Sequence, residues 1–222
     1  MLLIDFNSYC QSIAAAGNPV ALKALDVNLF VLRREHLYMA FVTIFFLPIL
    51  TMRLIAEEKK NRTIELLMTS PISSLDIVLG KYFAATILWI FILAITFIYP
   101  MLIKNLPEIQ IDWGTYLAST LGLFLFGALG IAIGLLASSL TENQLISAII
   151  GFALCAILYF LYNLYQVTDS TLSQLFYDFS SISHYLDFYK GVIDTSNIVY
   201  FVTAILFTLF VAERILESQR WR

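Results

Sequence analysis

Three long runs without a charged side chain constrain the fold of this chain more than any other feature. They are Tyr82–Ile103, Tyr116–Leu140 and Leu145–Tyr165. A helix needs roughly 20 largely apolar residues to cross the hydrocarbon core of a bilayer, and each run reaches that length. Backbone polar groups inside hydrocarbon must be paired, and a helix pairs them within the segment. The sequence therefore predicts an all-α integral membrane protein.

Two shorter apolar runs, Leu37–Met52 and Ile198–Ala212, extend this prediction. Their length alone fits either a span or a buried or re-entrant piece, and we interpret both as spans. Composition agrees, because 60% of the 222 residues are hydrophobic and only 13% are charged, whereas soluble domains carry about a quarter charged residues. We expect five transmembrane helices, at about 37–53, 82–103, 116–140, 145–165 and 196–212.

Basic side chains gather in two regions that five spans would place on one side of the membrane. These regions are the segment between the first two spans and the C-terminal tail. Their lysines and arginines are Arg53, Lys59, Lys60, Arg62, Lys81, Arg214, Arg220 and Arg222. The positive-inside rule puts them in the cytoplasm. We therefore expect a multi-pass protein of a bacterial-type cytoplasmic (inner) membrane, with a cytoplasmic C-terminus.

This orientation makes residues 1–36 an external N-terminal segment. Arg33 and Arg34 directly precede the first expected span and would have to be translocated. Either the positive-inside rule is overridden locally, or a preceding span is missing from the chain.

The polar segment 54–81 lies between two apolar runs. Ala56–Met68 is rich in helix formers, and Glu58 stands four residues before Arg62, a spacing that suits an ion pair on a helix. Pro71 disfavours helical backbone in the residue before it and so predicts a break. The segment is either a linker that lies at the membrane surface or a docking surface for a cytoplasmic partner.

A second helix is expected to begin after this break. Ser73 or Ser74 can cap it, and Asp76 then lies near its positively polarised N-terminal end. The segment should therefore form a helix, a turn and a second helix that continues into the next span.

The sequence contains no metallohydrolase, serine-hydrolase or phosphate-loop motif. His36 and His184 stand alone, and we interpret each as an interfacial polar residue. The three long runs contain no acid or base, which favours a pathway energised from outside the chain over an ion-driven carrier. We expect no catalytic residue, cofactor or metal, and the net charge of −3 indicates no nucleic-acid partner.

Three separated stretches, in order, resemble the permease subunits of ABC exporters of the second type. They are Thr51–Lys81 (TMRLIAEEKKNRTIELLMTSPISSLDIVLGK), Gly134–Phe152 (GLLASSLTENQLISAIIGF) and Ser181–Trp221. The last stretch ends in a Glu-Ser-x-x-Trp tail. The last stretch is similar to the gliding-motility branch in particular. The resemblance implies a subunit that contributes half of a translocation pathway. It would pair with a second permease copy or a paralogue and would contact membrane lipids. A separate ABC ATPase subunit would bind the ATP.

In that family the first cytoplasmic loop forms a coupling helix that inserts into a groove of the ATPase. The resemblance carries this contact onto Glu57, Glu58, Thr63, Glu65, Leu66 and Pro71. Arg62 departs from the family, which usually has glycine before the threonine, and we expect the arginine to stiffen the helix. The family also has six spans, and residues 1–36 resemble the loop after its first span, so the resemblance implies that the first span is missing here and that residues 37–222 form the transmembrane permease domain. Short re-entrant helices precede the last span in the family, and we expect them in an external segment at 166–195.

Small residues form a stripe along the third apolar run. They are Ala118, Gly122, Gly130, Gly134 and Ser138. Such residues let helices approach closely, so the stripe is interpreted as a packing contact within the chain, with a subunit interface or a substrate path as alternatives.

Two functions remain open on the sequence. The first is an exporter permease driven by a partner ATPase, with a lipid, glycan, drug or envelope component as substrate. The second is a membrane anchor or scaffold subunit of a motility or envelope complex, without a transported substrate of its own.

Overall fold

The computed structural model describes residues 33–64, 72–104, 111–167 and 171–220, and these form helices joined by short connections with no strand. In chain order the helices are α3 (Arg33–Thr51), α4 (Ala56–Lys60), α6 (Ser74–Thr96), α7 (Ile98–Lys104), α8 (Trp113–Leu140), α9 (Gln144–Val167), α10 (Thr171–Phe179), α11 (Ser181–Tyr189) and α12 (Thr195–Arg220). Five of the helical segments are long and apolar enough to cross a membrane, as the sequence predicted.

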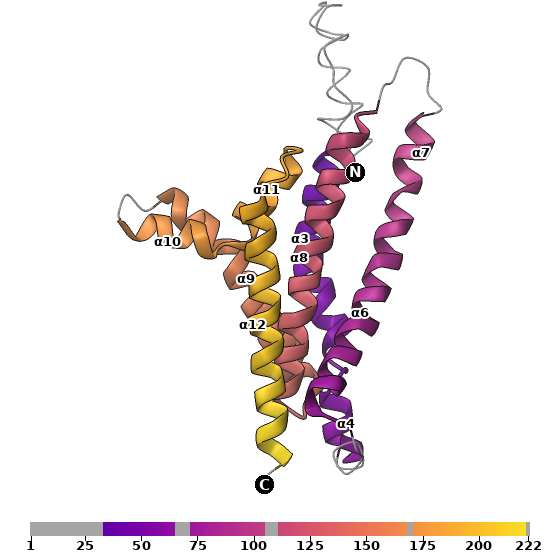
Figure 1. The fold of residues 1–222 in the computed structure, drawn as a ribbon, viewed down its shortest axis with the longest axis vertical. Coiled ribbons are helices and arrows are strands. Elements are labelled where there is room, and N and C mark those ends of the chain that lie inside the picture. The colour runs from indigo at the N-terminus through magenta and orange to yellow at the C-terminus, as the bar shows by residue number, and fades with distance from the viewer. Residues whose placement is uncertain (1–32, 65–71, 105–110, 168–170, 221–222) are drawn as a thin grey trace, which may run out of the picture.

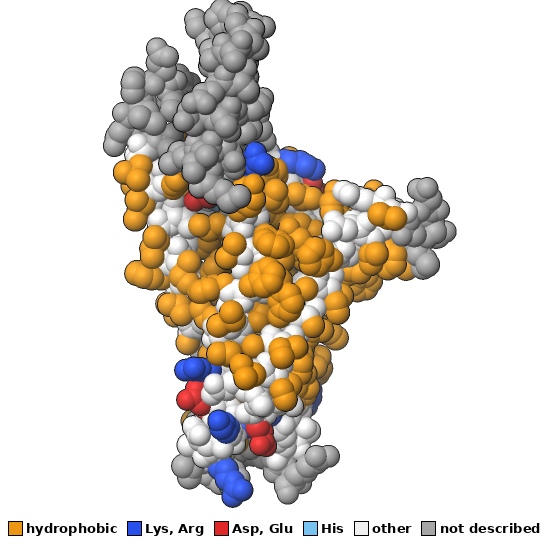
Figure 2. All heavy atoms as spheres, turned by 180° about the vertical axis from the view of Figure 1, so that it is seen from behind, with side chains coloured by type: hydrophobic (Ala, Val, Ile, Leu, Met, Phe, Trp, Pro, Cys, Tyr) orange, Lys and Arg blue, Asp and Glu red, His pale blue; other side chains and the backbone are white. Residues whose placement is uncertain are grey.

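The long helices run side by side as an upright bundle (Figure 1). Helix α4 and the C-terminal end of α12 lie at one end of this bundle, and α7 lies at the other. Hydrophobic side chains cover the middle of the face in Figure 2, while Lys, Arg, Asp and Glu lie near the two ends. This distribution is the one expected of a surface that faces lipid in the middle and water at both ends.

Helix α8 is the centre of the bundle. Within its apolar part 78% of the residues are buried, against 11% in α9. It packs against α3, α6, α9, α11 and α12. Its glycines permit these contacts, because a Cβ at Gly130 would lie 2.6 Å from the Leu47 side chain and one at Gly127 would lie 2.2 Å from Trp89. In the other four candidate spans 11–44% of the residues in the apolar part are buried, as expected of helices that also face lipid.

The start of α6 follows the sequence prediction closely. The Ser73 hydroxyl accepts a hydrogen bond from the Asp76 amide at 3.1 Å, and the Asp76 carboxylate accepts one from the Ser73 amide at 3.3 Å. This reciprocal pair is a capping box, which satisfies two backbone donors that a helix start leaves unpaired.

A break at Phe97 separates α6 from α7, and Pro100 explains it. Proline has no amide hydrogen, so the Thr96 carbonyl four residues earlier loses its helical donor. The Tyr116 hydroxyl of α8 replaces that donor and lies 3.2 Å from the Thr96 oxygen. The break is therefore tied to the central helix by one side chain.

Two short helices occupy the segment before the last span, where short re-entrant helices were expected. Helix α10 runs across the axis of the bundle (Figure 1), whereas α11 packs against α8 through Tyr185 and Phe188, which are fully buried. Gly122 makes that contact possible, because a Cβ there would lie 2.4 Å from Phe188. That these helices dip into the membrane stays a prediction.

Both histidines are held in bonded networks rather than standing alone at an interface. His36 is buried, and its Nε2 lies 3.0 Å from the Thr120 hydroxyl. The ring of His184 stacks on Tyr200 with centroids 4.0 Å apart, and its Nδ1 lies 2.7 Å from Asn197 Oδ1. Neither ring is isolated, which spacing along the chain could not reveal, and the interpretation of each histidine as an interfacial polar residue stays a prediction.

Removing the Tyr116 hydroxyl should destabilise the bundle only while Pro100 is present. Tyr116→Phe leaves the buried Thr96 carbonyl without a donor, which costs about 1–3 kcal/mol. In a Pro100→Ala background the new amide at position 100 can serve that carbonyl, so the same change should cost much less. A double-mutant cycle of thermal unfolding in detergent measures this coupling. Strictly additive effects would contradict the assignment.

Candidate functional site

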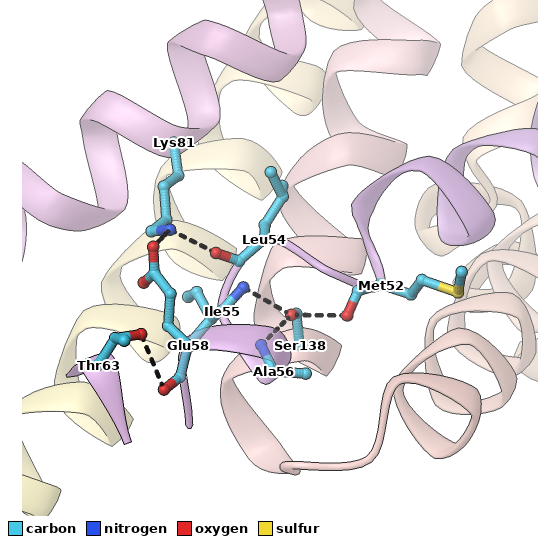
Figure 3. A network of polar contacts seen from close by, with 8 residues as sticks. All are labelled: Met52, Leu54, Ile55, Ala56, Glu58, Thr63, Lys81 and Ser138. Atoms are coloured by element: carbon cyan, nitrogen blue, oxygen red, sulfur yellow. Dashed lines mark hydrogen bonds and ion pairs between the residues drawn. The ribbon is translucent and has the colours of Figure 1, made fainter. Parts of the chain in front are cut away.

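The first cytoplasmic turn expected from the sequence is a compact junction of three helices. Helix α3 ends at Thr51, a turn covers residues 52–55, and α4 follows at Ala56. The turn packs against the last turns of α8 and the start of α6 (Figure 3). We call this arrangement the coupling junction.

Ser138 of α8 fixes the turn (Figure 3). Its buried hydroxyl accepts hydrogen bonds from the amides of Ile55 and Ala56, at 3.0 and 2.9 Å, and donates one to the Met52 carbonyl at 3.1 Å. Amides at the start of a helix have no partner within the helix, so an outside acceptor is required when they are buried. One side chain of α8 thus satisfies three backbone groups of the α3–α4 turn.

Lys81 of α6 holds the turn from the opposite side. Its Nζ donates to the Leu54 carbonyl at 2.5 Å and to Glu58 Oε1 at 2.6 Å. Both side chains are less than a third exposed. The expected pair between Glu58 and Arg62 is therefore wrong, since α4 ends at Lys60 and the one-turn helix cannot bring position 62 back above position 58.

Lys59 provides the third attachment. This lysine is 7% exposed, and its Nζ donates to the Ser139 carbonyl at the C-terminal end of α8. A helix C-terminus carries partial negative charge and accepts a cation favourably. Two helices, α6 and α8, are thus connected to the α3–α4 segment by buried or half-buried polar contacts.

Arg62 adopts the conformation that glycine favours. Its φ of 57° is the only positive value at a residue other than glycine among the described residues. An L-residue in this left-handed region costs roughly 1–2 kcal/mol, which glycine avoids. Arg62 therefore strains a turn, and the expectation that it stiffens the helix was wrong, because α4 ends at Lys60.

The predicted partner-contact residues fall into three groups. Glu57 and Thr63 are exposed at the surface of the junction, whereas Glu58 is half-buried and engaged by Lys81. Glu65, Leu66 and Pro71 lie outside the described residues. The exposed surface also presents Lys60 and Arg62, so it is polar and of mixed sign.

All five members of the small-residue stripe are buried within the chain. They are Ala118, Gly122, Gly130, Gly134 and Ser138. A Cβ at Gly134 would lie 1.9 Å from the Thr51 hydroxyl, at the residue where α3 ends. The lower part of the stripe therefore brings α3 against α8 directly above the coupling junction.

Sequence reasoning missed one acidic residue inside the bundle. Glu35 lies in the first turn of α3 and is only 8% exposed. The expected span began at residue 37, so the carboxylate was assigned to the external segment. The adjacent Arg33 and Arg34 hid it, because a charged cluster usually marks the end of a span.

A family model decides which proteins the chain is related to. The model for ABC-2 family transporter proteins matches residues 5–213. The chain belongs to this family. It is thus a membrane component of an ABC transporter, of a family whose permeases generally pair with an ABC ATPase subunit. A search of curated proteins found no match.

The coupling junction of this ABC-2 chain should depend on Ser138 more than on its neighbour. Ser138→Ala removes the acceptor of two buried amides, and each unpaired group costs about 1–3 kcal/mol. Ser139→Ala is the matched control, because among the described residues its hydroxyl donates only to the Leu136 carbonyl of its own helix. The temperature of thermal unfolding in detergent should fall clearly for Ser138→Ala and little for Ser139→Ala. Equal losses would contradict the proposed role of Ser138.

Arg62→Gly should stabilise the ABC-2 chain. The substitution removes the strain of a positive φ, worth about 1 kcal/mol. Asn61→Gly is the control, since Asn61 has a φ of −86° and glycine there only adds freedom to the unfolded chain. A higher unfolding temperature for the first variant and an unchanged or lower one for the second is expected. The reverse order would show that the turn is not left-handed.

Proposed function

We propose that this chain is the permease subunit of an ABC exporter and that the coupling junction receives force from a partner ATPase. The main support for this proposal is that α4 is joined to α3, α6 and α8 through Ser138, Lys59 and Lys81. A push on α4 would then reach three membrane-spanning helices at once. No bond chemistry is required of the chain, because the ATP is hydrolysed on the partner.

The exposed face of the junction is the proposed contact for the ATPase. Glu57 and Thr63 are its predicted contact residues in the described region, and Lys60 and Arg62 flank them. Glu65, Leu66 and Pro71 stay predicted contacts, where apolar side chains would fill the partner's groove. Glu58 is reassigned from docking to holding α6 against the turn, because its carboxylate pairs with Lys81.

The same end of the bundle is proposed to face the cytoplasm. Lys59, Lys60, Lys81 and Arg214 belong to segments at the end where α4 and the C-terminus lie. An excess of lysine and arginine near the ends of spans favours the cytoplasmic side. The location in a bacterial-type inner membrane, the pairing with a second permease and the gliding-motility branch stay predictions.

A scaffold function is the second candidate. The strongest support for transport over scaffolding is the rigid attachment of α4, since an anchor has no need to pass force into the bundle. Co-purification with the ATPase separates the two when ATP turnover is measured with candidate lipids and glycans. Turnover that responds to a candidate supports transport, and turnover indifferent to all of them supports the scaffold.

Charge reversal at Glu57 should weaken the ATPase complex. Glu57→Lys alters an exposed carboxylate for which no internal ion pair is found among the described residues, so the fold should survive while co-purified ATPase falls several-fold. Glu217→Lys makes the same charge change on α12 at the same end, where it breaks only an exposed ion pair with Arg214, and should retain the partner. Unchanged recovery with Glu57→Lys would contradict the docking assignment.

Glu58 needs a different design, because its reversal also breaks the ion pair with Lys81. Glu58→Lys combined with Lys81→Glu restores the pair with opposite polarity. Recovery of ATPase binding in the double variant supports a structural role for Glu58, whereas continued loss would return it to the docking surface.

A further inference from the structure

A cleft of about 470 Å³ separates α3 from α6 and α7, which diverge from the bundle toward the end opposite α4 (Figure 1). Tyr38, Val42 and Phe46 of α3 line one wall, and Trp89 of α6 and Tyr99 of α7 line the other. Its volume is within the range of about 300–1,000 Å³ that small-molecule sites occupy. The lining is mostly apolar and aromatic.

Glu35 is the one carboxylate among the residues that line this cleft. Its Oε2 is buried and has no hydrogen-bond partner among the described residues. An unpaired carboxylate oxygen in apolar surroundings is costly, and such groups inside membrane bundles usually mark a functional site. The atom therefore calls for a donor.

The neighbouring donors are engaged elsewhere. The Thr43 hydroxyl, on the same wall of the cleft, donates to the Met39 carbonyl at 2.6 Å. The Arg34 guanidinium lies over the Tyr38 ring, 5.8 Å from its centroid. His36 Nε2 is bonded to Thr120, away from the cleft. Charge complementarity thus points to a cation that comes from outside the described chain.

We propose that this cleft binds an amphiphile whose head carries a protonated amine. The ammonium pairs with the Glu35 carboxylate, and the aromatic ring of Tyr99 flanks the cation. The hydrocarbon chain lies along Val42 and Phe46, which are 58% and 39% exposed and so open toward lipid. This binding site is distinct from the coupling junction, and binding to it does not require the ATPase.

Trp89 provides a direct reporter of occupancy. The chain has three tryptophans, so Trp113→Phe with Trp221→Phe leaves Trp89 as the only one. The full chain in neutral detergent is titrated at neutral pH with dibrominated octadecylamine or with dibrominated octadecanol, which differ only in the head group. Bromine quenches tryptophan fluorescence at close range, so each titration reports binding in the cleft.

The amine should quench Trp89 at a concentration about ten-fold lower than the alcohol. Glu35→Gln should remove this difference, whereas Glu142→Gln, an exposed carboxyl at the other end of the bundle, should keep it. Val42→Phe narrows the cleft without changing the carboxylate and should weaken the binding of both probes. This variant tests the site even if circular dichroism shows that Glu35→Gln does not fold. Equal binding of the two probes to the parent protein would overturn the proposal.

Two further results would also overturn it. A preference for the amine that survives Glu35→Gln would show that the carboxylate is not the ligand. Absence of quenching by either probe would show that the cleft does not bind such amphiphiles. Neither result bears on ATPase co-purification, so the proposed coupling function stands or falls separately.

Discussion

The close approach of α3 to α8 is the constraint on which the remaining structure depends. Gly130 and Gly134 admit Leu47 and Thr51 to distances that no Cβ would tolerate. Packing replaces hydrophobic driving force between helices inside a bilayer, so small residues at such contacts determine which helices can meet. Because α3 ends against Gly134, its following turn is delivered to Ser138 one helical turn further along α8.

This geometry turns a surface loop into part of the bundle. A connection of this kind would normally be exposed and variable, but here the amides of Ile55 and Ala56 are buried and bonded to α8. Lys81 adds α6 to the same junction. The proposed coupling function follows from this attachment, since a rigid connection is what allows a displacement at α4 to reach the membrane-spanning helices.

Local chemistry was predictable from the sequence and long-range contacts were not. The spans follow from uncharged length alone, and the capping box of Ser73 and Asp76 needs only three residues of spacing. The partner of Glu58 is 23 residues away on α6 and cannot be read from helical periodicity. The left-handed turn at Arg62 and the burial of Glu35 likewise depend on tertiary packing, which overrides the local preference of an arginine or a charged cluster.

Pulsed electron paramagnetic resonance on the complex with the partner ATPase tests the central claim most directly. Spin labels replace Lys60 on α4 and Leu140 at the end of α8, both exposed, after Cys10 and Cys155 are changed to serine. If α4 is rigidly joined to α8, the distance distribution is narrow and identical with and without a non-hydrolysable ATP analogue. A broad distribution, or one that shifts with nucleotide, would contradict the account, because α4 would then move independently of the helix it is proposed to drive.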